Sequence, residues 1–265
     1  MTYHILNYQI DLGDKIIYTV RAIFVTNLAP KGDNTYSKDM LATLRQTAEL
    51  VDFFRKRGLK VTYRKGDIII RPGEQPPGVF YISEGLVKAY DITRYGDENL
   101  LIIRKDHEVF PLIWAITGQE RRIIYRALAP TIALRVSRNE FIDFMRQKPE
   151  VIAPLMDMTI EMYRLHSERI INLEYRSVRE RIISFLLTMS RRFGVETPEG
   201  LLIDVPLRHQ DIASSVNSSR ETTSRELSGL ERKGLLSKES SRILLKDPKK
   251  MQSYLTSPAN SISSS

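Results

Sequence analysis

The stretch HQDIASSVNSSRETTSRELSGL, residues 209–230, predicts two short helices joined by a tight turn. The first helix has an apolar inner face made of three residues, Ile212, Ala213 and Val216. Asn217 falls where the chain must reverse, and asparagine tolerates left-handed backbone better than most residues other than glycine. The second helix is expected to begin near Ser218 or Ser219. This arrangement is that of a helix-turn-helix.

The second helix of this pair collects polar side chains on one side. At about 100° per residue, Arg220, Glu221 and Arg225 fall within one arc of about 140° that faces away from Leu230. Arginine can donate two hydrogen bonds to guanine and glutamate can accept one from cytosine, while short hydroxyls reach phosphates. The pattern therefore predicts a helix for the major groove of double-stranded DNA. The candidate DNA-binding residues are Ser218, Ser219, Arg220, Glu221, Thr222, Ser224 and Arg225.

A solvated helix without a DNA partner is the alternative. Ser218 and Glu221 have the spacing of a capping box, and Arg225 can pair with Glu221 four residues earlier. Two observations favour DNA. Residues 230–247 read as a helix end, a glycine stop and two short strands, the pattern of a wing. Residues 176–254 contain fifteen Lys/Arg and ten Asp/Glu, so they hold +5 of the net charge of +8, as binding to a polyanion requires.

From Val61 to Val136 the sequence shows short apolar runs separated by turn residues. The segment Val61–Tyr90 contains four glycines, at 66, 73, 78 and 85, and Tyr95–Glu98 has the composition of a hairpin turn. Many short strands with closely spaced turns predict a compact β-roll. Ser137 and Glu140 have the spacing of a capping box, so a helix is expected to follow the last strand.

Residues 149–176 predict one long helix, with Pro154 suited to its first turn. Its apolar residues recur at steps of three and four, break at Arg169 and resume near Leu173. The favoured interpretation is that this stripe contacts a second copy of the chain. The alternative is that it packs on the β-roll of its own chain. The candidate dimer-interface residues are Leu155, Met158, Met162, Leu165 and Leu173.

Composition excludes several kinds of chemistry. The chain has no cysteine, which excludes disulfides, thiolate zinc sites, cysteine-ligated iron–sulfur clusters and cysteine nucleophiles. Its four histidines show no metal-ligand spacing, and no nucleophile motif or glycine-rich phosphate loop is present. We therefore expect no catalytic residue, no metal site and no enzymatic activity. No apolar run approaches the roughly 18 residues that span a membrane, and the start lacks signal-peptide features, so a cytoplasmic protein without a membrane partner is expected.

The patterns together predict an α+β fold with several parts. Residues 1–45 form an extension without an assigned role, in which Ile16–Val25 has the composition of a strand. Met40 opens a helix-like segment, and one alternative is that translation begins there. The parts that follow are a β-roll sensor (46–148), a dimerisation helix (149–176), a winged helix-turn-helix (177–255) and a disordered tail (256–265).

The sequence resembles the CRP/FNR superfamily of bacterial transcription regulators over about residues 46–250. The segments that carry the resemblance are YRKGDIIIRPGE (63–74), VFYISEGLVKAY (79–90), GQERRIIYRA (118–127), SERIINLEYRSVRERI (167–182) and SSRETTSREL (218–227). The resemblance implies a β-roll like a cyclic-nucleotide-binding jelly roll, a homodimer on an inverted repeat in double-stranded DNA, and RNA polymerase as a further partner. It assigns base recognition to Arg220, Glu221 and Arg225, with Ser219, Thr222 and Ser224 in support.

The resemblance also shows departures. Thr223 stands where the family has an aliphatic residue, and Asn217 replaces a turn glycine. In the sensor, Pro111 of FPLIWA (110–115) falls where cyclic-AMP binders have an acid for the ribose. Cyclic AMP is therefore not expected, and no other cofactor is implied. Arg121 aligns with the phosphate-binding arginine, and His166 with Ser167 lies where the family contacts adenine. These three residues form the candidate pocket for an unidentified small effector, and Arg121 suits an anion.

Two other function classes stay open from the sequence alone. The chain could be an effector-binding module whose helix-turn-helix serves protein contacts or non-specific DNA binding. In that case binding to DNA would be weak, salt-sensitive and indifferent to sequence. An enzyme is disfavoured because no catalytic constellation is visible.

Overall fold

The computed structural model describes residues 2–11, 17–26 and 48–256. The chain forms two units, Met1–Ala42 and Thr43–Ser265. In the first unit, β1 (Thr2–Asp11) pairs antiparallel with β2 (Ile17–Thr26), so the strand expected near residues 16–25 is present. The helix-like segment from Met40 lies outside the described residues up to position 47, and helix α2 covers Ala48–Arg57. The tail expected to be disordered also lies outside them from residue 257.

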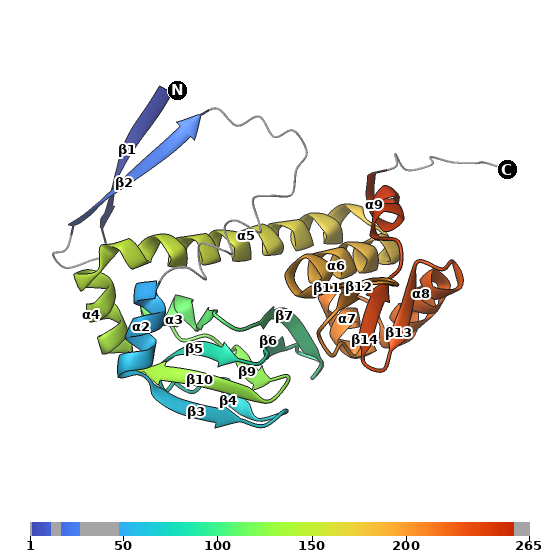
Figure 1. Ribbon diagram of the computed structural model, residues 1–265, viewed down its shortest axis with the longest axis horizontal. Helices are drawn as coiled ribbons and strands as arrows, with labels where there is room; N and C mark the ends of the chain where they lie inside the picture. Colours follow the sequence, from blue (N-terminus) through green and yellow to red (C-terminus); the bar gives the residue numbers. More distant parts are fainter. Residues whose placement is uncertain (1, 12–16, 27–47, 257–265) are drawn as a thin grey trace. The chain divides into compact units, whose positions relative to one another are not determined.

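The β-roll of the second unit consists of two four-stranded antiparallel sheets (Figure 1). One has the order β3 (Leu59–Tyr63), β10 (Thr131–Val136), β5 (Val79–Glu84), β8 (Val109–Phe110). The other has the order β4 (Ile68–Ile70), β9 (Ile124–Ala127), β6 (Val87–Ile92), β7 (Glu98–Arg104). Side chains from both sheets share one core, in which Phe80 and Phe110 stack at 5.1 Å between ring centroids, next to Ile70 and Val87. The predicted β-roll is confirmed.

The expected hairpin turn before residue 98 joins β6 to β7. The backbone amide of Thr93 donates to the Asp97 carbonyl at 2.9 Å, and Gly96 has a φ of 85°. That left-handed conformation costs glycine nothing, because it has no Cβ. The turn holds β6 and β7 in register. Both strands contribute residues to the contact between the sensor and the helix-turn-helix.

Capping boxes start two of the helices. Ser137 and Glu140 form the predicted box at α4 (Arg138–Gln147), and Ser177 with Glu180 forms another at α6 (Val178–Phe193). Between them lie the 3₁₀ turn η1 (Pro149–Val151) and the long helix α5 (Ile152–Tyr175), which has 24 residues. A short helix, α3 (Leu112–Thr117), precedes β9 in the sensor.

Part of the apolar stripe on α5 faces its own chain. Leu155 and Met158 are each only 4% exposed within this single chain. For these two residues the burial favours the alternative, packing on the same chain, while their place in a dimer interface stays an untested prediction. Met162 and Leu165 are partly exposed and Leu173 is 36% exposed, so for these three residues the interface stays a prediction.

The C-terminal part is a winged helix-turn-helix. Helices α7 (His209–Ser215) and α8 (Arg220–Arg232) follow strands β11 (Gly194–Thr197) and β12 (Gly200–Ile203), and the wing consists of β13 (Leu236–Glu239) and β14 (Arg242–Leu245). Helix α9 (Pro248–Thr256) packs on α6. Ile183, Ile212 and Leu227 are fully buried in the shared core. Asn217 has a φ of 49°, as expected for the turn residue.

Within the described part of the chain, no helix combines the length and the apolar character that crossing a membrane would need.

The capping box at α6 leads to a stability prediction. The Ser177 hydroxyl donates to the Glu180 carboxylate and holds the pKa of that carboxyl below its usual value. Ser177→Ala is expected to lower the free energy of unfolding by about 1 kcal/mol at neutral pH. A depressed carboxyl pKa stabilises the fold above the unfolded-state pKa, and that contribution is lost as pH falls through the folded-state pKa. The difference between variant and wild type in urea unfolding should therefore shrink on acidification; an effect that grows in acid would contradict the assignment.

Candidate nucleic-acid interface and sensor cavity

Helix α8 begins one residue later than the predicted capping box required. Ser219 is the N-cap, and its hydroxyl accepts a hydrogen bond from the Thr222 amide at 3.0 Å. The capping box expected between Ser218 and Glu221 is therefore wrong, because the third helical residue is Thr222. The Arg225 guanidinium donates to the Thr222 hydroxyl at 3.4 Å and forms no ion pair with Glu221 among the described residues.

The predicted reading face of α8 is open to solvent. Arg220, Glu221 and Arg225 are exposed, and the smaller candidates are partly or fully exposed: Ser218, Ser219, Thr222 and Ser224. The opposite side of the helix is buried, with Thr223 at 0% and Leu230 at 1% exposure. The Thr223 hydroxyl is buried without a hydrogen-bond partner in the described structure, which makes it the poorly satisfied core position anticipated from its polarity.

The surroundings of α8 are electropositive. Burial lowers the pKa of His209 at the start of α7, and the charges of Lys238 in the wing and Arg220 in α8 lower it further. Lys238 and Arg220 thus place two positive charges near the start of α7, where they suit a phosphate backbone.

The sensor contains a cavity of about 600 Å³ between α5, α3 and the sheet that contains β6, β7 and β9. Arg121 and His166 both line it, so two of the three candidate effector residues lie on one cavity, while Ser167 is not part of its lining. Sequence reasoning missed Arg104 and Arg169, which also line the cavity. The available signal for Arg169 was the break that it makes in the apolar stripe of the long helix.

The charge in this cavity is one-sided. None of the described residues that line it is acidic, whereas three are arginines. Burial lowers the pKa of His166, and Arg169, Arg104 and Arg121 lower it further, so the imidazole is neutral at pH 7. Arg104 pairs with the Glu108 carboxylate at 3.1 Å, and Glu108 is not among the residues that line the cavity. The arrangement can bind a small anion.

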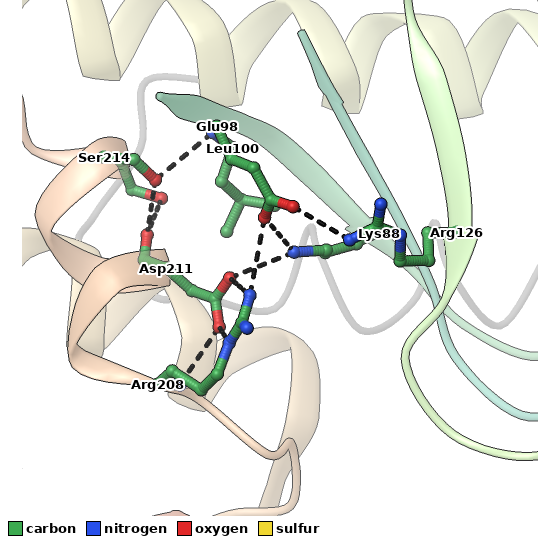
Figure 2. A network of polar contacts seen from close by, with 8 residues as sticks. Lys88, Glu98, Leu100, Arg126, Arg208, Asp211 and Ser214 are labelled. Atoms are coloured by element: carbon green, nitrogen blue, oxygen red, sulfur yellow. Dashed lines mark hydrogen bonds and ion pairs between the residues drawn. The ribbon is translucent and has the colours of Figure 1, made fainter. Parts of the chain in front are cut away.

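An ionic network with a buried centre joins the sensor to the first helix of the helix-turn-helix (Figure 2). Lys88 on β6 has a side chain 3% exposed, and its ammonium pairs with Glu98 on β7 and, at 3.3 Å, with Asp211 on α7. Glu98 also accepts from Arg126 on β9 at 2.9 Å, and Arg208 contacts both carboxylates. Three cations and two carboxylates thus connect three sensor strands with α7.

Asp211 has two structural roles in this network. Its carboxylate accepts from the Arg208 backbone amide at 3.1 Å, which caps the start of α7, and it faces the Lys88 ammonium of the sensor. Burial alone would raise the pKa of this carboxyl, but hydrogen bonds from Arg208 and the positive charges of Lys88 and Arg208 lower it overall. The group is therefore an anion at neutral pH although its side chain is only 4% exposed.

Arg169 makes a second connection between the same elements. Its guanidinium donates to the Leu100 carbonyl at 2.9 Å and to the Asn99 side-chain oxygen at 2.8 Å, both on β7, and to the Ser214 carbonyl on α7 at 3.1 Å. The Leu100 amide in turn donates to the Ser214 hydroxyl at 3.3 Å. One side chain of the long helix α5 therefore holds β7 and α7 together.

Two family models match this chain. A cyclic nucleotide-binding domain model covers residues 60–148, and a Crp-like helix-turn-helix domain model covers residues 180–254. The global nitrogen regulator of Synechococcus elongatus is 31% identical over 191 residues, which are 70% of this chain and 85% of that protein. The chain belongs to the CRP/FNR family of transcription regulators.

Other CRP/FNR proteins extend the similarity. The global nitrogen regulator of Synechocystis is 28% identical over 223 residues, covering 81% of this chain and 99% of that protein. Among solved structures, a CooA mutant from Carboxydothermus hydrogenoformans has a TM-score of 0.65 at 21% identity, covering 81% of this chain and 94% of that one. FixK2 of Bradyrhizobium japonicum has a TM-score of 0.64 at 24% identity, covering 74% and 96%. These two structures support the fold, and the family consists of transcription regulators rather than enzymes.

The network predicts a stability effect at Asp211. Asp211→Asn keeps the shape of the side chain but removes the charge that faces Lys88, so it should lower the free energy of unfolding by about 2 kcal/mol. The control Glu231→Gln removes an exposed carboxylate 4.0 Å from Lys238, which should change the stability by less than about 0.5 kcal/mol. Chemical denaturation of both variants measures the difference. Equal losses would show that the buried pair adds nothing beyond a surface pair.

Proposed function

We propose that this CRP/FNR regulator acts as a homodimer that binds inverted-repeat sites in double-stranded DNA through α8. The observation that carries the proposal is the exposed polar face of α8, opposite a fully buried apolar side. An arginine, a glutamate and a second arginine on that face match the donor and acceptor pattern of base edges in the major groove. Hydroxyls at the helix start, with Ser219 as cap, suit phosphate contacts.

The competing function, protein contacts through the helix-turn-helix, would use a different kind of surface. A protein interface is typically depleted of charge at its centre and rich in aromatic residues. The reading face of α8 has the opposite composition, and the positive charges near His209 favour a polyanion. The global nitrogen regulators among the relatives support a role in nitrogen-responsive transcription for this chain.

A homodimer is supported by the outer side of α5. A row of large apolar side chains is exposed there at steps of four, three and seven: Met156 (50%), Ile160 (49%), Tyr163 (73%) and Ile170 (57%). Tyr163 and Ile170 also line the sensor cavity, so the row borders it. An apolar stripe of this spacing on a helix of 24 residues suits a parallel contact with the same stripe of a second copy. We therefore propose this row, rather than Leu155 and Met158, as the centre of the interface.

The sensor cavity supports a small anionic effector. Arg104, Arg121 and Arg169 line it together with the neutral His166, and a bound anion would supply a negative charge that the lining lacks. Pro111, the residue before α3, stands where cyclic-AMP binders have the acidic residue that contacts the ribose. We therefore propose an effector other than cyclic AMP. The absence of cysteine from the sequence leaves no ligand set for a cysteine-bound iron–sulfur cluster.

Loss of one base-reading arginine tests the DNA proposal. Arg220→Ala should weaken binding to a selected inverted repeat by about 10- to 100-fold, because a bidentate contact with guanine contributes about 1–3 kcal/mol. Binding to random DNA should change far less. The control Arg146→Ala removes an exposed arginine of the sensor helix α4 and should leave both affinities unchanged. Titrations in which wild type does not distinguish the repeat from random DNA would rule the proposal out.

A charge on the outer side of α5 tests the homodimer. Ile160→Glu should shift the chain from dimer to monomer in sedimentation velocity, because two carboxylates would then meet in an apolar contact. The matched control is Ile92→Glu, since Ile92 is 47% exposed on the sensor strand β6 and Ile160 is 49% exposed. A dimer that survives Ile160→Glu but not Ile92→Glu would place the interface elsewhere.

A further inference from the structure

The helix-turn-helix is docked on the sensor of its own chain through contacts that the DNA surface does not use. Some are polar, and others are apolar, since Leu100, Ile103 and Leu128 of the sensor share a core with α6 and α7. The reading face of α8 is exposed, whereas the contacts with the sensor lie on α7 and on α6, where Arg192 pairs with Glu108 of the sensor at 2.7 Å. Docking therefore does not cover the reading face. What docking determines is where α7, and α8 with it, stands relative to the long helix α5.

Helix α8 follows α7 as one body. The Ser218 amide donates to the Ala213 carbonyl at 3.0 Å across the turn, and both helices bury side chains in one core, Ile212 from α7 and Leu227 from α8. A shift of α7 on the sensor must therefore move α8 by a similar amount, since close-packed elements move together.

Arg169 is the link between α5 and α7. Its three hydrogen bonds in the described structure all go to neutral oxygens, two on β7 and one at the Ser214 carbonyl of α7. Its Nε lies buried without a hydrogen-bond partner in the described structure, and the same side chain lines the sensor cavity. A guanidinium in this position cannot keep its bonds if α7 moves, and an anion in the cavity would compete for the same donors.

Lys88 makes the docking specific to one position. Its ammonium is withdrawn from water between Glu98 of its own sheet and Asp211 of α7. Moving α7 away would separate a buried cation from one of its two carboxylates, which low-dielectric surroundings penalise heavily. Buried polar contacts of this kind select one arrangement over similar ones, because an apolar contact could slide and this pair cannot.

We propose that Arg169 and Lys88 fix the helix-turn-helix on the sensor and thereby determine which half-site spacing the homodimer accepts. The proposal rests on the proposed function, since it needs two copies of α8 on one DNA. Each added base pair moves a half-site by about 3.4 Å along the duplex and rotates it by about 35°. Two rigidly docked copies of α8 can match one spacing, whereas loosely attached copies can adjust to several.

Two variants loosen the docking in different ways. Arg169→Gln removes the guanidinium that donates hydrogen bonds to both β7 and α7. Lys88→Met removes the ammonium but keeps an apolar stem of similar length, and both carboxylates of the network keep an arginine, Arg208 for Asp211 and Arg126 for Glu98. The matched control is Arg164→Gln, on the same helix α5, because among the described residues the Arg164 side chain pairs only with Glu161 and Glu168 of that helix.

The experiment measures binding to one inverted repeat whose spacer is lengthened or shortened in single base pairs. Wild type and Arg164→Gln should prefer one spacer over its neighbours by about tenfold or more, whereas Arg169→Gln and Lys88→Met should bind neighbouring spacers within about threefold of each other. The expected change concerns the spacer profile, whichever way the overall affinity moves. Wild-type profiles in both variants would overturn the proposal. If Arg169→Gln fails to fold, Lys88→Met alone decides.

A second measurement separates this proposal from the proposed function. If wild type binds no inverted repeat better than random DNA, the homodimeric DNA reader is wrong, and docking must be measured without DNA. Because the chain has no cysteine, Lys60→Cys on β3 and Lys249→Cys on α9 allow spin labels at two exposed sites only. The distance distribution should be narrow with Arg169 and Lys88 present and broad in either variant. Equal widths in all proteins would show that these residues do not hold the helix-turn-helix.

Discussion

A lysine ammonium withdrawn from water needs a carboxylate, and Lys88 has one on its own sheet and one on the helix-turn-helix. This constraint adds to an apolar contact between two domains, because the core around α6 also contains Leu100, Ile103 and Leu128 of the sensor, while a second core lies between the sheets of the β-roll. Asp211 adds to it because the same carboxylate caps α7. The same carboxylate therefore contributes to the start of the helix and to its attachment to the sensor.

The sensor cavity and the docking contact share a wall. Arg169 lines the cavity and also donates to the Ser214 carbonyl of α7. The same guanidinium is therefore exposed to the charge of the cavity and attached to the helix-turn-helix. Regulation in a two-domain protein requires a contact that responds to both sites. In this chain the two sites are adjacent, because residues of α5 that line the cavity lie within one helical turn of the residue that contacts α7.

Features set by neighbours in sequence were predictable. The turn at Asn217, the capping box of Ser137 with Glu140 and the hairpin before β7 all depend on residues within a few positions, and all are present. The box expected at Ser218 failed by one residue, because two consecutive serines offer two caps and packing of Thr223 and Leu227 on the core selects the later start. The N-cap preference of serine cannot distinguish Ser218 from Ser219, because both residues are equally good caps.

The stripe on α5 shows where local reasoning ends. Apolar residues occur on two sides of this helix, and spacing alone does not tell which side the β-roll covers: Leu155 and Met158 turn inward, whereas Ile160 and Tyr163 face solvent. By itself the sequence determined the elements, their order, the helix-turn-helix and the polar side of α8, because these follow from backbone preferences and short-range periodicity. Only the tertiary structure decided which face of α5 is free, that Arg169 closes a contact instead of breaking a stripe, and that Lys88 meets Asp211. That last pair lies 123 positions apart, and no local pattern encodes a contact that exists only after both domains have packed.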